Sequence, residues 1–260
     1  MNIVGIIPAR FASSRLMGKP LADIGGKPMI WHTYNRAKKA KLINDVIIAV
    51  DDSKVYDVCK NFGANVLMTP NDLQTGSDRI AFVAKEMPGA EIIVNIQGDE
   101  PFINPTMIDE AIEPLLFDKS VNVSTLAKKI ISVDELQSKS IPKVVFDYDG
   151  NALYFSRSPI PFVRDARNNL ERIASADIYK HIGLYVYRRD ALLKFANLEP
   201  TILEKAEKLE QLRMIENGMK IKIVPTEYES FSVDTPKDLQ IAREIYKKMK
   251  GKKKTVKSKN

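Results

Sequence analysis

Three cationic side chains follow the first apolar segment of the chain. Residues 2–8 (NIVGIIP) form a short apolar run that ends at proline, which is typical of a buried strand. The next loop carries Arg10, Arg15 and Lys19 among small residues: Ala12, Ser13, Ser14 and Gly18. Small residues let backbone amides approach a ligand, and amides together with three cations suit a polyphosphate. The loop lacks the Gly-Lys-Ser/Thr of a Walker A motif. Its place after the first strand favours ligand binding over three merely solvated cations.

Carboxylates follow two further predicted strands. Residues 95–101 (NIQGDEP) place Asp99 and Glu100 after an apolar run, and residues 232–238 (SVDTPKD) place Asp234 before a helix. A hard divalent cation prefers carboxylate oxygens, and a triphosphate brings such a cation with it. The alternative for Asp234 is a helix N-cap next to a first-turn proline. Capping does not exclude metal binding if Asp234 faces Asp99.

The remaining polar motifs are less specific. In residues 74–79 (QTGSDR), Ser77 is either a helix cap or part of a loop beside a nucleotide base. Residues 154–157, 179–185 and 207–213 carry polar and aromatic side chains that could lie near a sugar, including Glu210, Gln211 and Arg213. Periodicity alone shows only an amphipathic helix in the last of these segments. The composition of these motifs therefore does not identify an acceptor.

The elements that must position these residues alternate along the first part of the chain. Apolar runs at 2–8, 45–50, 65–68 and 91–96 are separated by helical patterns at 28–39, 53–62 and 78–85. This alternation predicts an α/β fold, a Rossmann-like three-layer α/β/α arrangement with a mostly parallel sheet. In such a fold ligands bind at the carboxyl ends of the strands.

The pattern changes in the middle of the chain. Residues 121–126, 143–147, 152–157 and 181–187 read as strands, and Asp149-Gly150 is a hairpin signal. We expect a smaller antiparallel section there, at about residues 120–200. A helix at 203–217, a strand at 220–224 and a closing helix at 236–248 complete the prediction.

Composition limits the classes of protein. The chain has 260 residues, 44% of them hydrophobic, and one cysteine, Cys59, so no intramolecular disulfide forms. No apolar run approaches the roughly 20 residues of a membrane helix, and we expect a cytoplasmic protein that is not inserted in a membrane. Residues 1–246 are expected to form one domain. Residues 247–260 hold eight lysines and no acid; without them the net charge of +7 falls to −1. This Lys-rich tail is expected to be disordered. Nucleic-acid binding would rest on the tail alone, so no specific nucleic-acid partner is expected.

The motifs together are similar to one enzyme family. PARFASSRLMGKPL, GKPMI, TGSDRI, NIQGDEP, ALYFSRSPIPF, YKHIGLYVY, LEKLEQLR and VDTPKDL occur here. The chain resembles the 3-deoxy-manno-octulosonate (Kdo) cytidylyltransferases, in which these motifs have the same order, from about Asn2 to Tyr246. The first motif is shared with sugar nucleotidyltransferases and CMP-sialate synthetases, whereas ALYFSR, YKHIG and LEQLR are particular to the Kdo enzymes.

The resemblance implies a nucleotidyltransferase fold and the transfer of CMP from CTP to the anomeric hydroxyl of Kdo. Pyrophosphate is released, and the product serves lipopolysaccharide synthesis. The resemblance also implies Mg²⁺ as cofactor and a homodimer with the middle section at the contact. The residues implied in nucleotide binding are Pro8, Ala9, Arg10, Arg15, Lys19, Gln74, Ser77 and Arg79. Those implied in metal binding are Asp99 and Asp234, and catalysis is assigned to these two with Arg10 and Lys19. Those implied in sugar binding are Gln97, Arg157, His181, Tyr185, Glu210 and Gln211. Arg157 is the candidate for the sugar's carboxylate, because its planar fork can bind two oxygens.

The chain departs from the common Kdo pattern at two places. Residues 229–232 (ESFS) replace a Gly-rich segment before VDTP, and TGSDR replaces the more usual TGTER. Both departures occur in related enzymes that act on 8-amino-Kdo. Transfer to 8-amino-Kdo or to a sialic-type acid is therefore the alternative within the enzyme class. An RNA-binding protein and an inactive homologue are the alternatives outside it. The joint presence of Arg10, Lys19, Asp99 and Asp234 argues against an inactive homologue.

Overall fold

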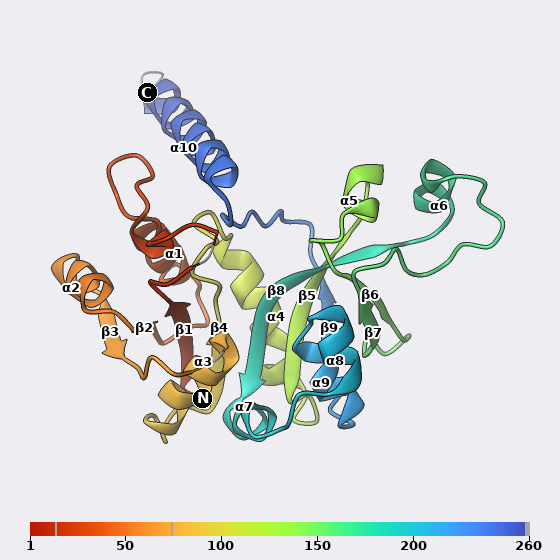
Figure 1. The fold of residues 1–260 in the computed structure, drawn as a ribbon, viewed down its shortest axis with the longest axis horizontal. Coiled ribbons are helices and arrows are strands. Elements are labelled where there is room, and N and C mark those ends of the chain that lie inside the picture. Colours follow the sequence, from red (N-terminus) through yellow and green to blue (C-terminus); the bar gives the residue numbers. More distant parts are fainter. Residues whose placement is uncertain (14, 74, 258–260) are drawn as a thin grey trace. The chain divides into compact units, whose positions relative to one another are not determined.

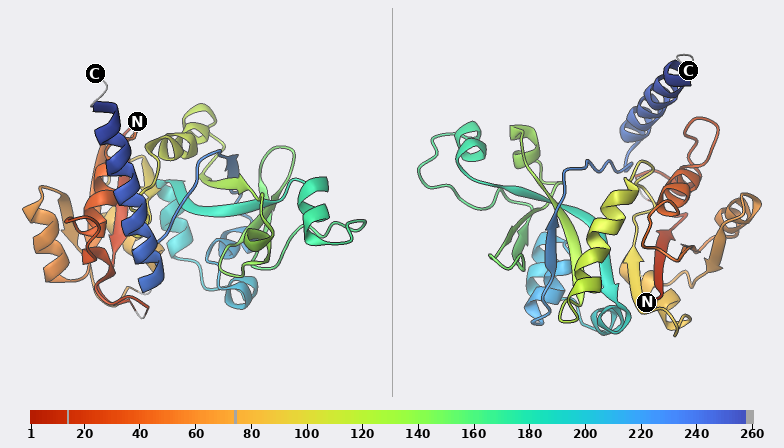
Figure 2. Two further views of the ribbon diagram at one scale, coloured as in Figure 1. Left: turned by 90° about the horizontal axis from the view of Figure 1, so that it is seen from above. Right: turned by 180° about the vertical axis from the view of Figure 1, so that it is seen from behind.

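The computed structural model describes residues 1–13, 15–73 and 75–257 (Figures 1 and 2). Gln74 and Ser14, which we expected at the nucleotide, lie outside the described residues. The chain divides into two compact units where we expected one domain. The N-terminal unit comprises Val4–Glu86, Asn95–Pro105 and the chain from Ser230 onwards. The central unit comprises Met1–Ile3, Met87–Val94 and Thr106–Glu229.

The N-terminal unit is built on parallel strands with helices around them (Figure 1). Its strands lie in the order β3 (Asn65–Met68), β2 (Asp45–Val50) and β1 (Ile3–Ala9). Its helices are η1 (Lys19–Leu21), α1 (Met29–Ala37), α2 (Ser53–Asn61), α3 (Gly76–Lys85) and α10 (Pro236–Lys257). Six of the seven residues of β1 are buried, so both faces of this strand are covered, as in a parallel α/β sheet. Parallel pairing aligns Ala9 with Val50, which brings the ends of β1 and β2 to one edge.

The helices of this unit begin at recognisable caps. Asp52 caps α2 by accepting hydrogen bonds from the backbone N–H groups of Lys54 and Val55. Thr75 caps α3 and forms a capping box with Asp78. Ser77, the cap that we considered from the sequence, lies inside the first turn instead, because Thr75 precedes it with the three-residue spacing to Asp78 that a capping box needs.

The central unit carries the antiparallel section that was predicted. Its strands are β4 (Ile92–Asn95), β5 (Val123–Lys129), β6 (Lys143–Phe146), β7 (Ala152–Ser156), β8 (Tyr179–Arg188) and β9 (Lys222–Pro225). They follow the order β4-β8-β5-β9, with β6 beside β7 and β8. The β5–β8, β6–β7 and β6–β8 pairs are antiparallel, and β5–β9 is parallel. The α/β class is thus confirmed, with antiparallel strands in the middle of the chain.

Six helices accompany these strands. They are α4 (Pro105–Phe117), α5 (Val133–Gln137), α6 (Asn169–Ser175), α7 (Arg189–Ala196), α8 (Ile202–Glu207) and α9 (Gln211–Glu216). The single helix that we expected at 203–217 is wrong, because the chain breaks between α8 and α9. Lys208 takes a left-handed conformation there, with φ of 54°. No residue preference predicts such a break at lysine.

Helix α10 is longer than the sequence pattern suggested. We expected a helix to Lys248 and disorder from Lys247, whereas the backbone is helical as far as Lys257 (Figure 2). Lysine is a good helix former and no proline follows Pro236, so the helix continues through Gly251 although a glycine is unfavourable in a helix interior. Tyr246 anchors this helix, since its ring packs directly on Gly25 and edge-on to His32. Within the described ranges, no helix is both long and apolar enough to cross a membrane.

Candidate nucleotide-transfer site

A cavity of about 330 Å³ opens at the end of β1 in the N-terminal unit. We call it the loop cavity, and its lining is Pro8, Arg10, Ala12, Ser13, Arg15, Lys19, Pro20, Gly76, Gln97, Gly98 and Asp99. The phosphate loop predicted from the sequence therefore meets the Asn95–Pro101 motif in one hollow. The start of α3 also reaches it through Gly76, so the positive end of a helix dipole faces the same space. Ala9 is buried at the end of β1.

Lys19 contacts both carboxylates that were predicted to bind a metal. Its Nζ lies 2.5 Å from Asp99 Oδ2 and 2.9 Å from Asp234 Oδ1. Arg15 reaches the same Asp234 oxygen at 3.0 Å. Burial lowers the pKa of Lys19, but the carboxylates of Asp99 and Asp234 outweigh it and raise the pKa above its ordinary value. Lys19 is therefore fully protonated at neutral pH.

The two carboxylates fit a magnesium site. Asp99 and Asp234 come from segments far apart in sequence, yet both contact one ammonium nitrogen, so their oxygens converge on a single point. Within the described ranges, no group of three or more His, Cys, Asp or Glu side chains gathers as a metal site. Mg²⁺ needs no such group, because it usually binds one or two carboxylates and completes its shell with water and substrate phosphates.

Gly98 allows the Asp99 loop to lie against β1. A Cβ at this position would be 2.7 Å from the Pro8 carbonyl oxygen, which is closer than such atoms approach. The Thr33 hydroxyl donates a hydrogen bond of 3.2 Å to the Gly98 carbonyl and holds the loop from the other side. The glycine between Gln97 and Asp99 therefore lets the Asp99 segment lie close to the end of β1.

Asp51 is a member of the site that the sequence did not single out. Its Oδ1 accepts the Phe11 N–H at 3.0 Å. Its Oδ2 lies 3.0 Å from Arg79 Nη2 and 3.6 Å from Arg10 Nε. Arg79, predicted at the nucleotide, is completely buried, and it also contacts Thr69 and the Pro70 carbonyl. The sequence feature that could have identified Asp51 is its position directly after the second strand, where α/β folds bind ligands.

Glu100, the neighbour of Asp99 in the chain, is buried. Burial, followed by the negative charge of Asp99, raises the pKa of Glu100 to about 7, while a hydrogen bond from Ser230 acts in the opposite direction. Its Oε2 has no hydrogen-bond partner among the described residues. The sequence marked Glu100 only as the neighbour of Asp99.

The residues predicted for the sugar divide between the units. Gln97 lines the loop cavity in the N-terminal unit, whereas Arg157, His181, Tyr185, Glu210 and Gln211 all belong to the central unit. His181 lies on β8, where its Nε2 is 3.0 Å from the Thr125 hydroxyl. Its ring contacts Phe155 and Tyr185 at centroid distances of 5.0 and 5.3 Å. Burial lowers the pKa of His181 to about 3, so the imidazole is neutral at physiological pH.

Tyr185 is buried beside His181. Its hydroxyl makes no well-formed hydrogen bond among the described residues, although the nearby Thr125 hydroxyl interacts with it and slightly opposes the rise of its pKa. Burial, with smaller effects from Tyr187 and from the negative charge of Glu210, raises the pKa of Tyr185 well above its usual value. The hydroxyl is therefore protonated at neutral pH and can donate a hydrogen bond. Glu210 and Gln211 begin α9.

Arg157 holds backbone carbonyls. Its Nε, Nη1 and Nη2 donate to the carbonyl oxygens of Glu207, Lys139 and Lys208, at 2.7, 2.9 and 3.2 Å. Its own N–H donates to the Glu207 carboxylate at 2.9 Å, which also accepts from the Ser156 hydroxyl. Arg157 therefore fixes the break between α8 and α9, directly before Glu210 and Gln211. Its predicted role as ligand of a sugar carboxylate stays a prediction.

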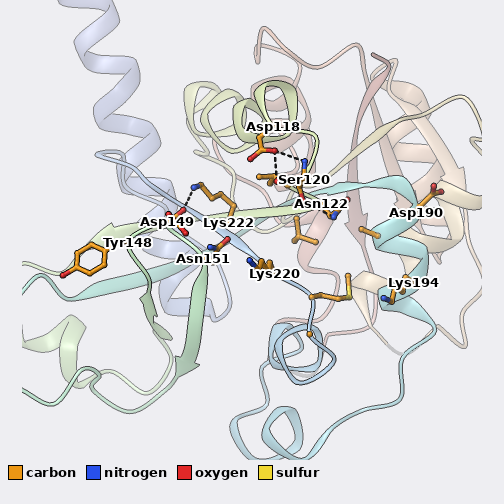
Figure 3. Close-up of a pocket in the computed structure, with 15 residues that line it drawn as sticks. Asp118, Ser120, Asn122, Tyr148, Asp149, Asn151, Asp190, Lys194, Lys220 and Lys222 are labelled. Carbon is orange, nitrogen blue, oxygen red and sulfur yellow. Dashed lines mark hydrogen bonds between the residues drawn. The ribbon is translucent and has the colours of Figure 1, made fainter.

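A larger cavity in the central unit contains none of the predicted site residues (Figure 3). Its volume is about 890 Å³, and the turn between β6 and β7 lines it together with α7 and the segment before β9. Three lysines and three aspartates balance in charge: Lys194, Lys220, Lys222, Asp118, Asp149 and Asp190. Asp118 binds Ser120, and Lys222 binds the Asp149 carbonyl. The loop cavity, with its excess of cations, is the better site for a polyphosphate.

Comparison with known proteins agrees with this geometry. Residues 4–221 match the family described as Cytidylyltransferase. The 3-deoxy-manno-octulosonate cytidylyltransferase of Geobacter sulfurreducens is 54% identical, over 92% of this chain and 97% of its own length. The enzyme of that name from Pelobacter propionicus is also 54% identical, over 97% of this chain and 100% of its own length.

Solved structures of nucleotidyltransferases also resemble this chain. The structure of a CMP:2-keto-3-deoxy-manno-octonic acid synthetase complexed with CTP has a TM-score of 0.89 and 40% identity, over 96% of this chain and 100% of that one. A 4-diphosphocytidyl-2C-methyl-D-erythritol synthase from Anaerococcus prevotii, at 16% identity and a TM-score of 0.61, shares the fold. The chain belongs to the cytidylyltransferase family, in the group of the 3-deoxy-manno-octulosonate cytidylyltransferases.

Proposed function

We propose that this chain transfers CMP from CTP to the anomeric hydroxyl of Kdo, giving CMP-Kdo and pyrophosphate for lipopolysaccharide synthesis. One observation carries the proposal: Lys19 lies between Asp99 and Asp234 at a cavity that Arg10 and Arg15 also line. Cations for a triphosphate and carboxylates for its metal thus meet at the end of β1. The names of close relatives support Kdo as the acceptor over its 8-amino analogue or a sialic-type acid.

The cations of the loop cavity would bind and stabilise the triphosphate. Arg10 and Arg15 are 41% and 64% exposed, so both can approach phosphate oxygens. Lys19 is protonated, and it lies beside the residues that would hold the metal. As the bond between the α- and β-phosphates breaks, negative charge builds up on the leaving pyrophosphate. Positive groups that are already in place stabilise that charge without reorganising.

Asp99 and Asp234 would hold Mg²⁺. When bound, this ion supplies Lewis-acid chemistry, because it withdraws charge from phosphate oxygens and lowers the pKa of a hydroxyl group. Both carboxylates already bind a cation, because each contacts the Lys19 ammonium and Asp234 also contacts Arg15.

The residues of the central unit would recognise the sugar. The buried Tyr185 hydroxyl and the neutral His181 ring offer hydrogen bonds to a ligand. Glu210 and Gln211 would bind sugar hydroxyls from the start of α9. A neutral His181 cannot form an ion pair with the carboxylate of Kdo, so this interaction falls to another donor. Arg157 remains the candidate for this role. Its guanidinium would have to release one of the carbonyl oxygens that it now binds in order to bind the sugar carboxylate.

The chain is also proposed to act as a cytoplasmic homodimer. Large apolar side chains stand exposed in the central unit, including Leu153, Phe162 and Leu170, at 58%, 80% and 71%. Such residues support a protein contact in the section at residues 120–200. Sedimentation equilibrium of the full chain at micromolar concentration tests this. A monomer mass would contradict it.

Pyrophosphate release tests the reaction. The full chain is incubated with CTP and Mg²⁺ and with Kdo, 8-amino-Kdo or N-acetylneuraminic acid, and the products are identified by mass spectrometry. We expect the highest kcat/KM with Kdo. Turnover restricted to 8-amino-Kdo or to the nine-carbon acid would replace the acceptor but keep cytidylyl transfer. No turnover with any of the three acids would reject the function.

A further inference from the structure

The carboxylate of Asp51 contacts three groups near the loop cavity: the Phe11 N–H, Arg10 and Arg79. A negative charge is unexpected there, because a triphosphate would repel it. It follows β2, and the register that pairs Ala9 with Val50 places it next to Arg10. We infer that Asp51, supported by Arg79, is a positioning residue that aims Arg10 at the phosphates of CTP. This inference rests on the proposed cytidylyl transfer. It adds Asp51 to the site and gives the buried Arg79 a supporting role in place of direct contact with the nucleotide.

The charges of the three side chains explain why an acid is tolerated here. Arg79 is completely buried, and its Nη2 forms a 3.0 Å ion pair with Asp51. Arg10 is the exposed member, 3.6 Å from the same oxygen. Two guanidinium groups share one carboxylate, so Arg10, Arg79 and Asp51 together keep a net charge of +1. Arg10 presents this charge to the loop cavity, because it is the member that lines it. Without Arg79, the carboxylate would neutralise Arg10 instead.

The backbone contacts of Asp51 extend its effect to the rest of the loop. Its Oδ1 accepts the Phe11 N–H at 3.0 Å, and the Phe11 carbonyl accepts the Gly18 N–H at 3.1 Å. The Phe11 ring also lies against Gly18. Asp51 therefore holds Phe11, and through Phe11 it holds Gly18, the residue before Lys19, before a ligand arrives. Groups that are already in position lose less entropy on binding.

The Asp51→Asn variant separates positioning from simple electrostatics. The amide keeps an oxygen for the Phe11 N–H but loses the charge that pairs with Arg10. Electrostatics alone would then give tighter CTP binding, because a negative charge near a polyanion disappears. Positioning predicts the opposite, with the Kd for CTP rising about tenfold and kcat/KM falling by at least as much.

The neighbouring Asp52→Asn variant is the matched control. Asp52 is also an acid after β2, but its carboxylate caps α2 and is turned to Lys54 and Val55. Asparagine caps a helix as well as aspartate does. Asp52→Asn should therefore bind CTP with the Kd of the wild type, and its melting temperature should be unchanged.

A double-mutant cycle with Arg10→Ala tests whether Asp51 acts through Arg10. If it does, adding Asp51→Asn to Arg10→Ala changes the Kd for CTP by less than about twofold. Additive effects, or CTP binding by Asp51→Asn that equals or exceeds wild-type binding, would overturn the inference. Binding is measured by equilibrium dialysis of CTP without any sugar, so the result is read even if Kdo is not the acceptor.

The Asp51→Glu variant covers the case in which Asp51→Asn fails to fold. Glutamate preserves the negative charge next to the buried Arg79, so its melting transition should remain. The extra methylene displaces the carboxylate from Arg10 and Phe11. We expect a several-fold weaker affinity for CTP. Wild-type affinity in folded Asp51→Glu would overturn the inference equally.

Discussion

Lys19 and Asp99 form the tightest charge pair of the loop cavity, with 2.5 Å between Nζ and Oδ2. Their side chains are only 16% and 22% exposed, so solvent screens the pair weakly. Asp234 approaches the same nitrogen from the other side. A cation-binding point is therefore built into the protein before any nucleotide or metal arrives. Lys19 stands at that point, so a metal held by Asp99 and Asp234 would require the Lys19 side chain to move.

Asp99→Asn should abolish turnover without unfolding the chain. The amide keeps the shape of the side chain but offers a metal only one weak oxygen ligand. Lys19 keeps Asp234 as a partner, so no charge is left unpaired. We expect kcat to fall by about 10³-fold or more, with a melting temperature close to that of the wild type.

Stopped assays at increasing Mg²⁺ concentration check the cause of this loss. If Asp99 holds the metal, Asp99→Asn needs far more Mg²⁺ for half-maximal activity, and EDTA abolishes wild-type turnover. Wild-type activity in the variant would show that Asp99 is not a ligand.

Gly98→Ala should destabilise the protein and displace Asp99, because the new side chain would collide with the backbone of β1. The new Cβ would lie 2.7 Å from the Pro8 carbonyl, and a backbone oxygen cannot swing aside. We expect a loss of about 1–3 kcal/mol in the free energy of unfolding. A reduced kcat is also expected, since Asp99 moves with the loop. Urea denaturation and pyrophosphate release measure the two effects.

Gly89→Ala is the control for this change. A Cβ at Gly89 meets no atom within 4 Å, and the residue does not have a positive φ. Alanine there should leave activity unchanged and give equal or slightly higher stability. Equal behaviour of the two alanine variants would refute the packing argument for Gly98.

The sequence predicted the parts of the site that depend on single strands. Lys19 and Asp99 each follow an apolar run, and the structure brings both side chains to one point. Asp51 also follows a strand, but its role depends on β2 lying next to β1 in a register that no local pattern encodes. The break at Lys208 was missed because it depends on distant contacts. Arg157 supplies these by binding the carbonyls of Glu207 and Lys208.

Arg157→Lys should loosen the break between α8 and α9. A lysine ammonium is a point charge and cannot match the three separate directions of a guanidinium fork. At least one of the three carbonyls then loses its partner, which costs about 1–3 kcal/mol if that group stays buried. Since Glu210 and Gln211 follow the break, the KM for the sugar should rise more than the KM for CTP.

The exposed Arg167 provides the comparison for this substitution. Arg167→Lys should change neither the unfolding curve nor either KM. A selective rise in the KM for CTP in Arg157→Lys would contradict the assignment of this segment to the sugar.

The stability of the protein should decrease in acid partly through His181. Burial lowers the pKa of His181 to about 3, below the ordinary value of 6.5 that applies when the chain is unfolded. Above pH 6.5 the residue is neutral in both states and has no effect on unfolding. As the pH falls from 6.5 towards 3, only the unfolded state takes up the proton, so the folded state loses stability. At pH 4.5 these pKa values correspond to a loss of about 2.7 kcal/mol, or two pH units at about 1.36 kcal/mol each. We expect about 2 kcal/mol, because the side chain is partly accessible and solvent weakens the effect.

The His181→Gln variant isolates this contribution from the carboxylates and from His32, whose pKa burial also lowers. Glutamine can still bond to the Thr125 hydroxyl, but it has no proton to take up. Urea unfolding of both proteins is measured at pH 7.5 and pH 4.5. The difference in unfolding free energy between wild type and variant should shift by about 2 kcal/mol in favour of His181→Gln at the lower pH. A constant difference would mean that the imidazole titrates equally in both states, and His181 would then be open enough to bind the sugar as a cation.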